Sequence, residues 1–325
     1  MSVEGANASA TTELDKVNEE VKAQALLPGW APRPGGPSMW PEPRPDLLPG
    51  SWSYANAREL LARSAPLLTM EQTERRNVIL VNEAEGNHYP TLRTHVLAYQ
   101  MILPGEHART HRHSPHAGRL IIEADPGTYT VVDGKKVPMH SGDVVLTPGG
   151  SWHGHGHDGE TPAFWLDFLD VPLVQLLHPM FFEPFPDEWQ APDPDAGDPS
   201  GLIFAWSETE PRLAAARPDA DGTHGARVRL GDPALPTIGL YMERLTAGAS
   251  TVPLRTTANR ELCIVHGEGV TTIGDKEYPW TTGDVLAIPA WTFAAHRVSD
   301  DATFFEMTDE PLMSYCGYLR RELRS

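Results

Sequence analysis

Cysteine and positive charge are both scarce in this 325-residue sequence. Cys263 and Cys316 are its only cysteines, which are too few for a disulfide framework and fit a reducing compartment. Lys and Arg number 26 against 44 Asp and Glu, and the formal net charge is −18. Because this charge repels nucleic-acid phosphates and anionic lipid surfaces, a small-molecule partner is favoured over nucleic acid or a membrane.

Long hydrophobic runs are also missing. No stretch approaches the roughly 20 apolar residues that a membrane span requires. The N-terminal MSVEGANASATTELDKVNEE lacks the basic segment and the following apolar segment of a secretory signal. Together with the cysteine content, these absences predict a cytoplasmic protein with no membrane partner.

Histidine, in contrast, is concentrated in one part of the chain. Ten of the 14 histidines fall between residues 88 and 157. They are His88, His95, His107, His111, His113, His116, His140, His153, His155 and His157. Since imidazole is a common metal ligand and exchanges protons near neutral pH, a metal or proton-transfer site is expected in this stretch.

The first part of the chain predicts helices and an extended arm, and a β-rich region follows. Residues 12–26 carry apolar residues on a loose 3–4 spacing, residues 28–49 are rich in proline and glycine, and residues 54–64 again favour a helix. From about residue 91 to 174, short apolar or alternating runs are separated by Gly, Pro, Asp or His. This spacing is typical of an all-β barrel or sandwich rather than of βαβ units.

The β pattern occurs twice, on either side of a Pro- and Asp-rich stretch that begins at Pro186. VVDGKKVPMHSGDVVLTPGGSWH and TIGDKEYPWTTGDVLAIPAWTFAAH show the same order of strands and turns, as expected when one barrel unit is used twice. The length suits two such domains. We predict an N-terminal helical and extended arm (1–88), a first barrel with a metal site (89–185), a linker (186–235) and a second barrel without one (236–325).

The first barrel contains a histidine pattern suited to a metal site. His111 and His113 are two residues apart, so in a strand both side chains point to the same face. His153 follows the turn residues Gly142-Asp143 and Pro148-x-Gly150, which can bring it beside the pair on a neighbouring strand. Three imidazoles then form one face of a metal site. The alternative is that the pair are solvated rim residues and His153 is a capped turn residue.

These two patterns, Gly-x5-His-x-His and Gly-x5-Pro-x-Gly-x2-His, resemble the two conserved motifs of the cupin superfamily. The resemblance implies an all-β fold of two double-stranded β-helix (jelly-roll) barrels. The glutamate usual in the first motif is absent, and Ala117, Gly118 and Arg119 occupy its region. A neutral three-His site leaves a divalent cation its full charge and open positions, which suits an anionic bidentate substrate together with O2.

A wider set of motifs resembles gentisate 1,2-dioxygenase and its relatives that act on salicylate and hydroxynaphthoate. The set comprises ILPGEHARTHRH, Arg119, VVDG-x4-MHSGD, WHGHG and WLDFLDVPL. The resemblance implies a ring-cleaving dioxygenase in which Fe(II), held by His111, His113 and His153, chelates the carboxylate and ortho-hydroxyl of a hydroxybenzoate-type acid. O2 is then inserted between the two ring carbons that bear these groups. The resemblance further implies a homo-oligomer, a tetramer or a dimer.

The resemblance also implies roles for residues around the metal. By position, Arg119 holds the substrate carboxylate, His155 is the acid–base histidine, Asp167 is its orienting partner, and Gln100 lies in the pocket. Arg119 can bind a carboxylate in a bidentate manner that lysine cannot reproduce. From the residues alone, a salt-bridged surface arginine, a surface histidine and a solvent-facing aspartate stay open as alternatives.

Further matches and departures bear on the substrate. Arg75 and Arg76 match the family's ERR segment and can reach over the pocket or across a subunit interface, although salt bridges to surface carboxylates are an alternative. Val96 replaces an aromatic residue, His116 replaces a small polar one, and HGHGH, ending at His157, replaces HDHGN. The loss of a stacking ring and the gain of imidazoles predict a substrate other than gentisate, such as a larger or differently substituted hydroxybenzoate.

The second barrel repeats the pattern without the ligands. Aligning its repeat with the first places Leu254, Thr256 and Ala294 at the three ligand positions, and none of these side chains binds iron. His296 alone is kept, at the position of His155. The second barrel is therefore predicted to be a structural or interface partner rather than an active site.

Two other functions stay open for such a chain. Three imidazoles do not select one metal, so a cupin isomerase, decarboxylase or hydrolase using Zn, Mn or Ni fits the same residues. A non-enzymatic, metal-dependent small-molecule-binding protein is the other alternative. Consumption of O2 separates the dioxygenase from both.

Overall fold

The chain forms two compact units, Met1–Pro43 and Arg44–Ser325. The computed structural model describes residues 3–33, 36–37, 39–73, 75–232 and 234–324. The first unit begins with helix α1 (Val3–Ala23), which confirms the helix predicted over residues 12–26 and extends it toward the N-terminus. Among the residues just given, no helix combines the length and apolar character of a membrane span.

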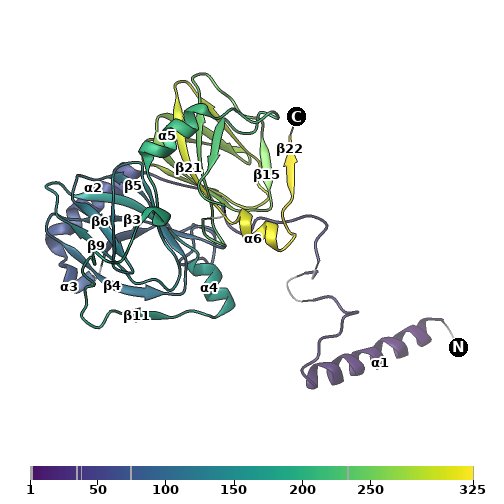
Figure 1. Ribbon diagram of the computed structural model, residues 1–325. Helices are drawn as coiled ribbons and strands as arrows, with labels where there is room; N and C mark the ends of the chain where they lie inside the picture. The colour runs from purple at the N-terminus through teal and green to yellow at the C-terminus, as the bar shows by residue number, and fades with distance from the viewer. Residues whose placement is uncertain (1–2, 34–35, 38, 74, 233, 325) are drawn as a thin grey trace. The chain divides into compact units, whose positions relative to one another are not determined.

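The second unit contains four β-sheets, which form two barrels (Figure 1). In the first barrel, a six-stranded sheet (β12-β8-β5-β10-β3-β2) and a five-stranded sheet (β11-β4-β9-β6-β7) share a core that includes Ile102, Val132 and Trp165. Its strands are β2 (Arg76–Ile79), β3 (Val96–Ile102), β4 (His107–His113), β5 (Ala117–Glu123), β6 (Thr128–Val132), β7 (Lys135–Pro138), β8 (Val144–Thr147), β9 (His153–His157), β10 (Ala163–Leu169), β11 (Phe182–Pro184) and β12 (Ile203–Phe204).

The second barrel repeats this plan, with sheets β1-β19-β16-β21-β14-β13 and β18-β17-β20-β15-β22. Leu262, Trp280 and Phe304 lie in its core. Its strands are β1 (Gly50–Trp52), β13 (Ala226–Arg229), β14 (Gly239–Leu245), β15 (Leu254–Thr256), β16 (Arg260–His266), β17 (Glu268–Ile273), β18 (Lys276–Thr281), β19 (Val285–Ile288), β20 (Ala294–Val298), β21 (Ala302–Thr308) and β22 (Arg321–Leu323). The predicted fold of two all-β barrels is confirmed.

Short helices flank the barrels. The helix predicted over residues 54–64 is confirmed as α2, whose N-terminus is capped by Ser53. The helices of the second unit are α2 (Tyr54–Ser64), α3 (Met70–Thr73), α4 (Val171–Leu177), α5 (Trp206–Ala215) and α6 (Glu310–Tyr315), with single 3₁₀ turns at Ala65–Leu67 and Ser200–Leu202.

The β6–β7 hairpin shows how the sequence specifies local structure. Asp133 and Gly134 connect the two strands with positive φ angles of 48° and 82°. Two consecutive positive φ angles define the tight turn that matches the twist of antiparallel strands, and Asp-Gly is a preferred sequence for it. The VVDG pattern in the sequence therefore predicts this hairpin correctly.

Each repeat begins with a strand that joins the barrel of the other repeat. Strand β1 pairs with β19 of the second barrel, whereas β12 pairs with β8 of the first. The helix after each strand is held in the same way, because Tyr54 N donates to Asp284 Oδ1 and Trp206 N donates to Asp143 Oδ1, both at 2.8 Å. Segments of the predicted arm and linker thus contribute strands to the barrels. The predicted domain boundaries stay a prediction.

The two six-stranded sheets pack against each other through a shared apolar core. The rings of Phe168 and Phe305, one from each barrel, are 5.6 Å apart, and Tyr99 Oη donates to the backbone oxygen of Gly283 at 2.7 Å. A fully buried pair also crosses this interface, because His95 Nδ1 lies 3.0 Å from Glu261 Oε2 and their side chains are 1% and 0% exposed.

The charge state of His95 depends on its buried carboxylate neighbours. Burial lowers the pKa of His95, but Glu261, with smaller contributions from Asp309 and Asp170, raises it more, so the net pKa lies above the ordinary value. The stabilisation from protonated His95 is therefore fully present below pH about 6.5 and is lost as the pH rises through the raised folded-state pKa.

Replacing His95 with glutamine is therefore expected to destabilise the protein most at low pH. Breaking a buried pair costs about 3 kcal/mol, so the melting temperature of His95→Gln should lie several degrees below that of the parent at pH 6, and the gap should narrow at pH 9. Calorimetric melting at both values tests this, with exposed His140→Gln as the control. A gap that does not change with pH contradicts the role of the protonated imidazole.

Candidate metal centre

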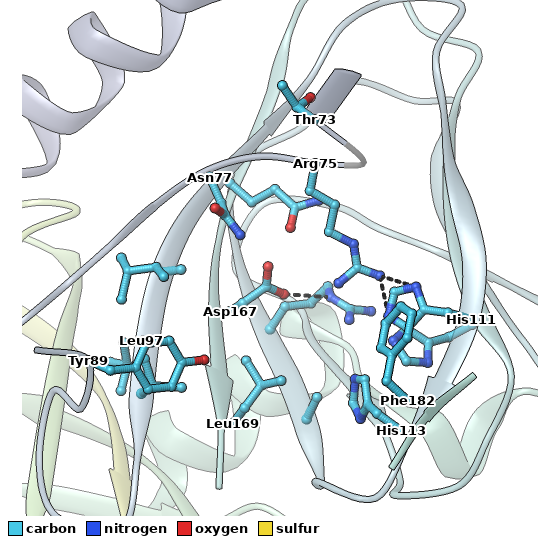
Figure 2. A pocket seen from close by; sticks show the side chains of 17 residues that line it. Thr73, Arg75, Asn77, Tyr89, Leu97, His111, His113, Asp167, Leu169 and Phe182 are labelled. Atoms are coloured by element: carbon cyan, nitrogen blue, oxygen red, sulfur yellow. Dashed lines mark hydrogen bonds and ion pairs between the residues drawn. The ribbon is translucent and has the colours of Figure 1, made fainter. Parts of the chain in front are cut away.

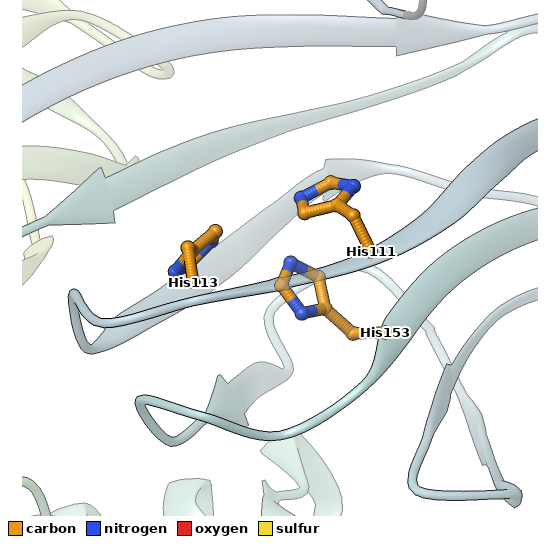
Figure 3. Close-up of side chains that lie close together, drawn as sticks. All are labelled: His111, His113 and His153. Atoms are coloured by element: carbon orange, nitrogen blue, oxygen red, sulfur yellow. The ribbon is translucent and has the colours of Figure 1, made fainter. Parts of the chain in front are cut away.

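His111, His113 and His153 converge on one point inside the first barrel (Figure 3). The first two lie on β4, and β9 places His153 directly opposite His111 in the strand register. One ring nitrogen from each residue lies within 4.8 Å of the others. The ring of His153 is 4.4 Å from that of His111 and 4.8 Å from that of His113. The predicted arrangement, with His111 and His113 on one face of a strand and His153 beside them, is therefore confirmed.

Backbone carbonyl groups fix the orientation of all three rings. Each Nδ1 lies at hydrogen-bond distance from a carbonyl oxygen two residues away in the chain. The acceptors are Arg109, Pro115 and Ser151, at 3.3, 2.9 and 3.1 Å. A carbonyl oxygen can only accept, so these contacts favour the tautomer that has the proton on Nδ1 and the lone pair on Nε2. Histidines that bind metals show this arrangement.

The charge state of the cluster also suits a cation. Burial, followed by the nearby Arg75 guanidinium, lowers the pKa of His111 to about 2 and that of His113 to about 4. Burial lowers the pKa of His153 well below its ordinary value, and in the described part of the chain its buried Nε2 has no hydrogen-bond partner. All three rings are neutral at pH 7, as metal ligands must be. The donor set therefore fits a divalent metal.

Arg75 lies over the histidine cluster, as one of the two predicted placements requires. Its Nη2 atom is 2.9 Å from Nε2 of His111 (Figure 2). A cation bound by the three Nε2 atoms takes the lone pair to which Arg75 donates, so Arg75 has to release His111 when a metal binds. The guanidinium then lies beside the metal, where it can meet an anionic ligand.

The histidines open into a cavity of about 390 Å³ (Figure 2). Five other residues predicted from the sequence line it. They are Arg75, Val96, Gln100, Arg119 and Asp167. The amide oxygen Oε1 of Gln100 is buried and unpaired within the described residues. Since a buried polar atom normally has a partner, this oxygen is a candidate acceptor for a ligand.

Arg119 and Asp167 form a buried ion pair in the cavity wall. They face each other across β5 and β10, and Arg119 Nε donates to Asp167 Oδ1 at 3.2 Å. Trp165 Nε1 donates to the other carboxylate oxygen at 3.1 Å. This pairing corrects the prediction that Asp167 orients His155. Register explains the difference, because β5 lies beside β10 in the same sheet, whereas His155 is on a strand of the opposite sheet.

His155 is buried behind the metal cluster and is not among the cavity-lining residues. Its ring is 6.4 Å from that of His153 and 5.2 Å from that of Trp165. Burial, and then Arg119, lower its pKa well below the ordinary value. Neither ring nitrogen has a hydrogen-bond partner among the residues that the structure covers. His155 is therefore a neutral imidazole in a dry environment rather than the surface histidine of the alternative.

Two further predicted pocket residues face away from the cavity. Arg76 is held at 2.5 Å from Glu106 Oε2 and also donates to the backbone oxygen of Leu68. Arg75 and Asn77, its neighbours, both line the cavity, as the alternation of side chains along an extended segment requires. The Nδ1 atom of His116 accepts a hydrogen bond from the backbone of Gly149, so His116 supports a turn. The prediction that Arg76 and His116 contact the substrate is not supported by this placement.

The sequence reasoning missed Phe182. Strand β11 pairs with β4 and places Phe182 at the cavity, with its ring stacked at 4.9 Å on that of His111. No sequence pattern marked this residue, because it lies in an irregular stretch after the last regular strand of the repeat. Asn77 and Tyr89 were missed too. Asn77 was detectable from its two-residue spacing from Arg75.

The second barrel places Leu254 opposite Ala294, the same pairing that His111 and His153 make in the first. The described residues include one other possible ligand group, His224, Glu243 and Glu306. Both carboxylates in that group are already paired with basic side chains. Glu243 contacts His224 and Arg227, while Glu306 contacts Arg227 and Arg260. This group forms an ion-pair network within the barrel.

Known proteins resemble this chain over nearly its full length. A family model described as a cupin domain matches residues 98–169. The chain is 31% identical to a 5-aminosalicylate 1,2-dioxygenase from Comamonas sp, over 97% of this chain and 91% of the relative. It is 30% identical to gentisate 1,2 dioxygenase 1 from Aquipseudomonas alcaligenes, over 86% and 88%. The salicylate 1,2-dioxygenase from Pseudoaminobacter salicylatoxidans, solved as an adduct with gentisate, aligns with a TM-score of 0.85 at 25% identity, over 96% of this chain and 94% of that one.

Replacing His153 with alanine is expected to remove the bound divalent metal, because the two remaining imidazoles no longer surround it. The metal content of protein loaded under anaerobic conditions, measured by mass spectrometry, should fall from one ion per chain to a small fraction of that. The exposed His140→Ala variant is the control. Full metal content in His153→Ala contradicts the assignment of the site.

Proposed function

The chain belongs to the family of gentisate and salicylate 1,2-dioxygenases, which cleave aromatic rings, and we propose that it inserts O2 between the carboxyl- and hydroxyl-bearing carbons of a hydroxybenzoate-type acid. One observation carries the proposal. Three histidines that present Nε2 lone pairs and one buried arginine line the same cavity. A metal and a carboxylate-binding group side by side fit an aromatic acid that carries a neighbouring hydroxyl group.

We propose Fe(II) as the metal. Three neutral imidazoles accept several divalent ions, and the dioxygenase family of the chain supports iron among them. When bound, Fe(II) would pass electrons from the aromatic substrate to O2 and would offer open positions for the oxygen atoms of the substrate. His111, His113 and His153 hold it through Nε2, which gives the unpaired Nε2 of His153 its partner.

Arg119 is proposed to bind the substrate carboxylate. Its side chain is fully buried and lines the cavity beside the histidines. In such a water-poor site a guanidinium–carboxylate contact is stronger than in solvent. Asp167 balances the charge of Arg119 before substrate enters. Arg75 adds a second positive group on the cavity wall, so the site selects anions.

The proposed substrate is a salicylate-type acid whose ring substituent is larger than the hydroxyl of gentisate or differs from it chemically. Val96 lines the cavity where the family usually has an aromatic residue, which leaves more room beside the substrate ring. The unpaired Oε1 of Gln100 can accept a hydrogen bond from an amino or hydroxyl substituent. Asn77, directly opposite Gln100 in the register, adds a second amide to this side of the cavity.

His155 stays the predicted acid–base residue. Both of its ring nitrogens are without partners in the described chain, so the N–H group and the lone pair of the neutral imidazole are not engaged by other side chains. The isomerase, decarboxylase, hydrolase and binding-protein alternatives gain no support, because the relatives compared above are dioxygenases. A homo-oligomer also stays part of the proposal.

Oxygen uptake tests the reaction and the substrate together. Protein loaded with Fe(II) under anaerobic conditions is expected to consume O2 with a substituted salicylate, such as 5-aminosalicylate, at a higher kcat/KM than with gentisate. Salicylate and 1-hydroxy-2-naphthoate complete the panel, and zinc-loaded protein is the inactive control. Gentisate as the best substrate overturns the substrate assignment alone, whereas no uptake with any acid overturns the reaction.

Replacing Arg119 with lysine is expected to raise KM for the aromatic acid by about 10- to 100-fold, since a lost charge-assisted hydrogen bond costs about 1.5–3 kcal/mol. Lysine keeps the charge but cannot make the planar two-point contact. Arg58→Lys is the matched control, because Arg58 makes a two-point contact with Glu123 on the surface. An unchanged KM in Arg119→Lys rules out Arg119 as the carboxylate ligand.

A further inference from the structure

Asp167 divides its two carboxylate oxygens between Arg119 and Trp165. Oδ1 accepts from Arg119 Nε at 3.2 Å, and Oδ2 accepts from the indole Nε1 of Trp165 at 3.1 Å. Trp165 and Asp167 are two residues apart on β10, so both point to the same face of the strand. All three side chains are buried, with exposures of 0%, 1% and 6% for Trp165, Arg119 and Asp167. Buried polar atoms need such partners.

The equivalent position in the second barrel has an aromatic ring but no N–H group, so a comparison of the barrels distinguishes the two features of Trp165. Strand β21 is the equivalent of β10, and the register places Phe304 at the position of Trp165 and Glu306 at that of Asp167. Phe304 packs on His296 with the rings 5.2 Å apart, the same spacing that Trp165 has from His155. The ring is kept in both barrels, but only the barrel with the metal ligands has the indole N–H.

The partners of the acidic residue change in parallel. In the second barrel Glu306 is held by Arg260 and Arg227, with contacts of 2.8 Å from each. In the first barrel a single arginine and the indole share Asp167. In the first barrel, the second partner of the acidic side chain is therefore the neutral N–H group of Trp165 and not a second arginine. Arg119 is the one cation that contacts Asp167 in the described residues.

We propose that Trp165 is a positioning residue, whose indole N–H fixes the Asp167 carboxylate and thereby aims the Arg119 guanidinium at the substrate carboxylate. Arg119 has five N–H groups. Its hydrogen bonds within the described residues use one on Nε, to Asp167, and one on Nη1, to Thr130 at 3.4 Å. The other N–H groups remain for a ligand in the cavity that Arg119 lines. The inference rests on the proposed function, in which Arg119 binds that carboxylate.

The Trp165→Phe variant removes the N–H and keeps a ring that the second barrel shows to fit this position. KM for the aromatic acid, and its anaerobic dissociation constant, are expected to rise about 10-fold, as for a lost buried hydrogen bond. The metal content and kcat should change little, because no metal ligand is touched. In an Arg119→Lys background, Trp165→Phe should cause no further rise in KM, since it acts through Arg119.

Trp280→Phe is the matched control, because the buried Trp280 indole donates to Thr271 Oγ1 at 2.9 Å in the second barrel, away from the metal ligands. It should leave KM unchanged. If KM rises in Arg119→Lys but not in Trp165→Phe, the positioning role fails and the proposed function stands. If neither variant changes KM, the proposed role of Arg119 fails as well. Should Trp165→Phe not fold, Asp167→Asn carries the same test, with the same expected rise in KM.

Discussion

The hydrogen bonds between the three histidine Nδ1 atoms and backbone carbonyl groups are the contacts on which the rest of the site depends. An imidazole can present either nitrogen, and only a fixed proton on Nδ1 commits Nε2 to the centre of the cluster. Each acceptor is only two residues away in the chain, so the backbone of β4, of the turn after it and of the turn before β9 sets the geometry. The cavity, with Arg75, Arg119 and Phe182 in its wall, surrounds a centre that the main chain defines.

Charge inside the first barrel differs in sign from charge on the molecule as a whole. The chain carries −18 overall, whereas the cavity contains Arg75 and Arg119 against one carboxylate, Asp167. At physiological ionic strength the overall charge is screened beyond about 8 Å, so it opposes an anionic substrate only weakly at long range. The fully buried Arg119 and the half-buried Arg75 are screened less than charges on the surface. Selection for an anion is therefore a local property of the cavity wall.

Local patterns could be predicted from the sequence, and choices between distant partners could not. The spacing of His111 and His113 follows from strand alternation, and the Asp133-Gly134 hairpin follows from turn chemistry. The predicted partner of Asp167, His155, was wrong, because a choice between Arg119 and His155 requires the order of the strands in the sheets. The placement of Arg75 over the pocket, but not of Arg76, depends on the phase of one short strand. The exchange of β1 and β12 has no local pattern, because each pairs with a strand far away in the chain.

The exchange of β1 and β12 explains how the two barrels can differ in their metal ligands and still depend on each other. A repeat on its own could pair β1 or β12 only with a second copy, as in a dimer with swapped strands. In such a dimer every substitution appears in both copies. If one copy lacks the metal-binding histidines, the other copy lacks them too, and the dimer has no metal site. Joining the copies in one polypeptide replaces association at cellular concentration by a permanent local partner. In the single chain, one half can therefore lack metal ligands while its strand β12 completes a sheet of the half that has them.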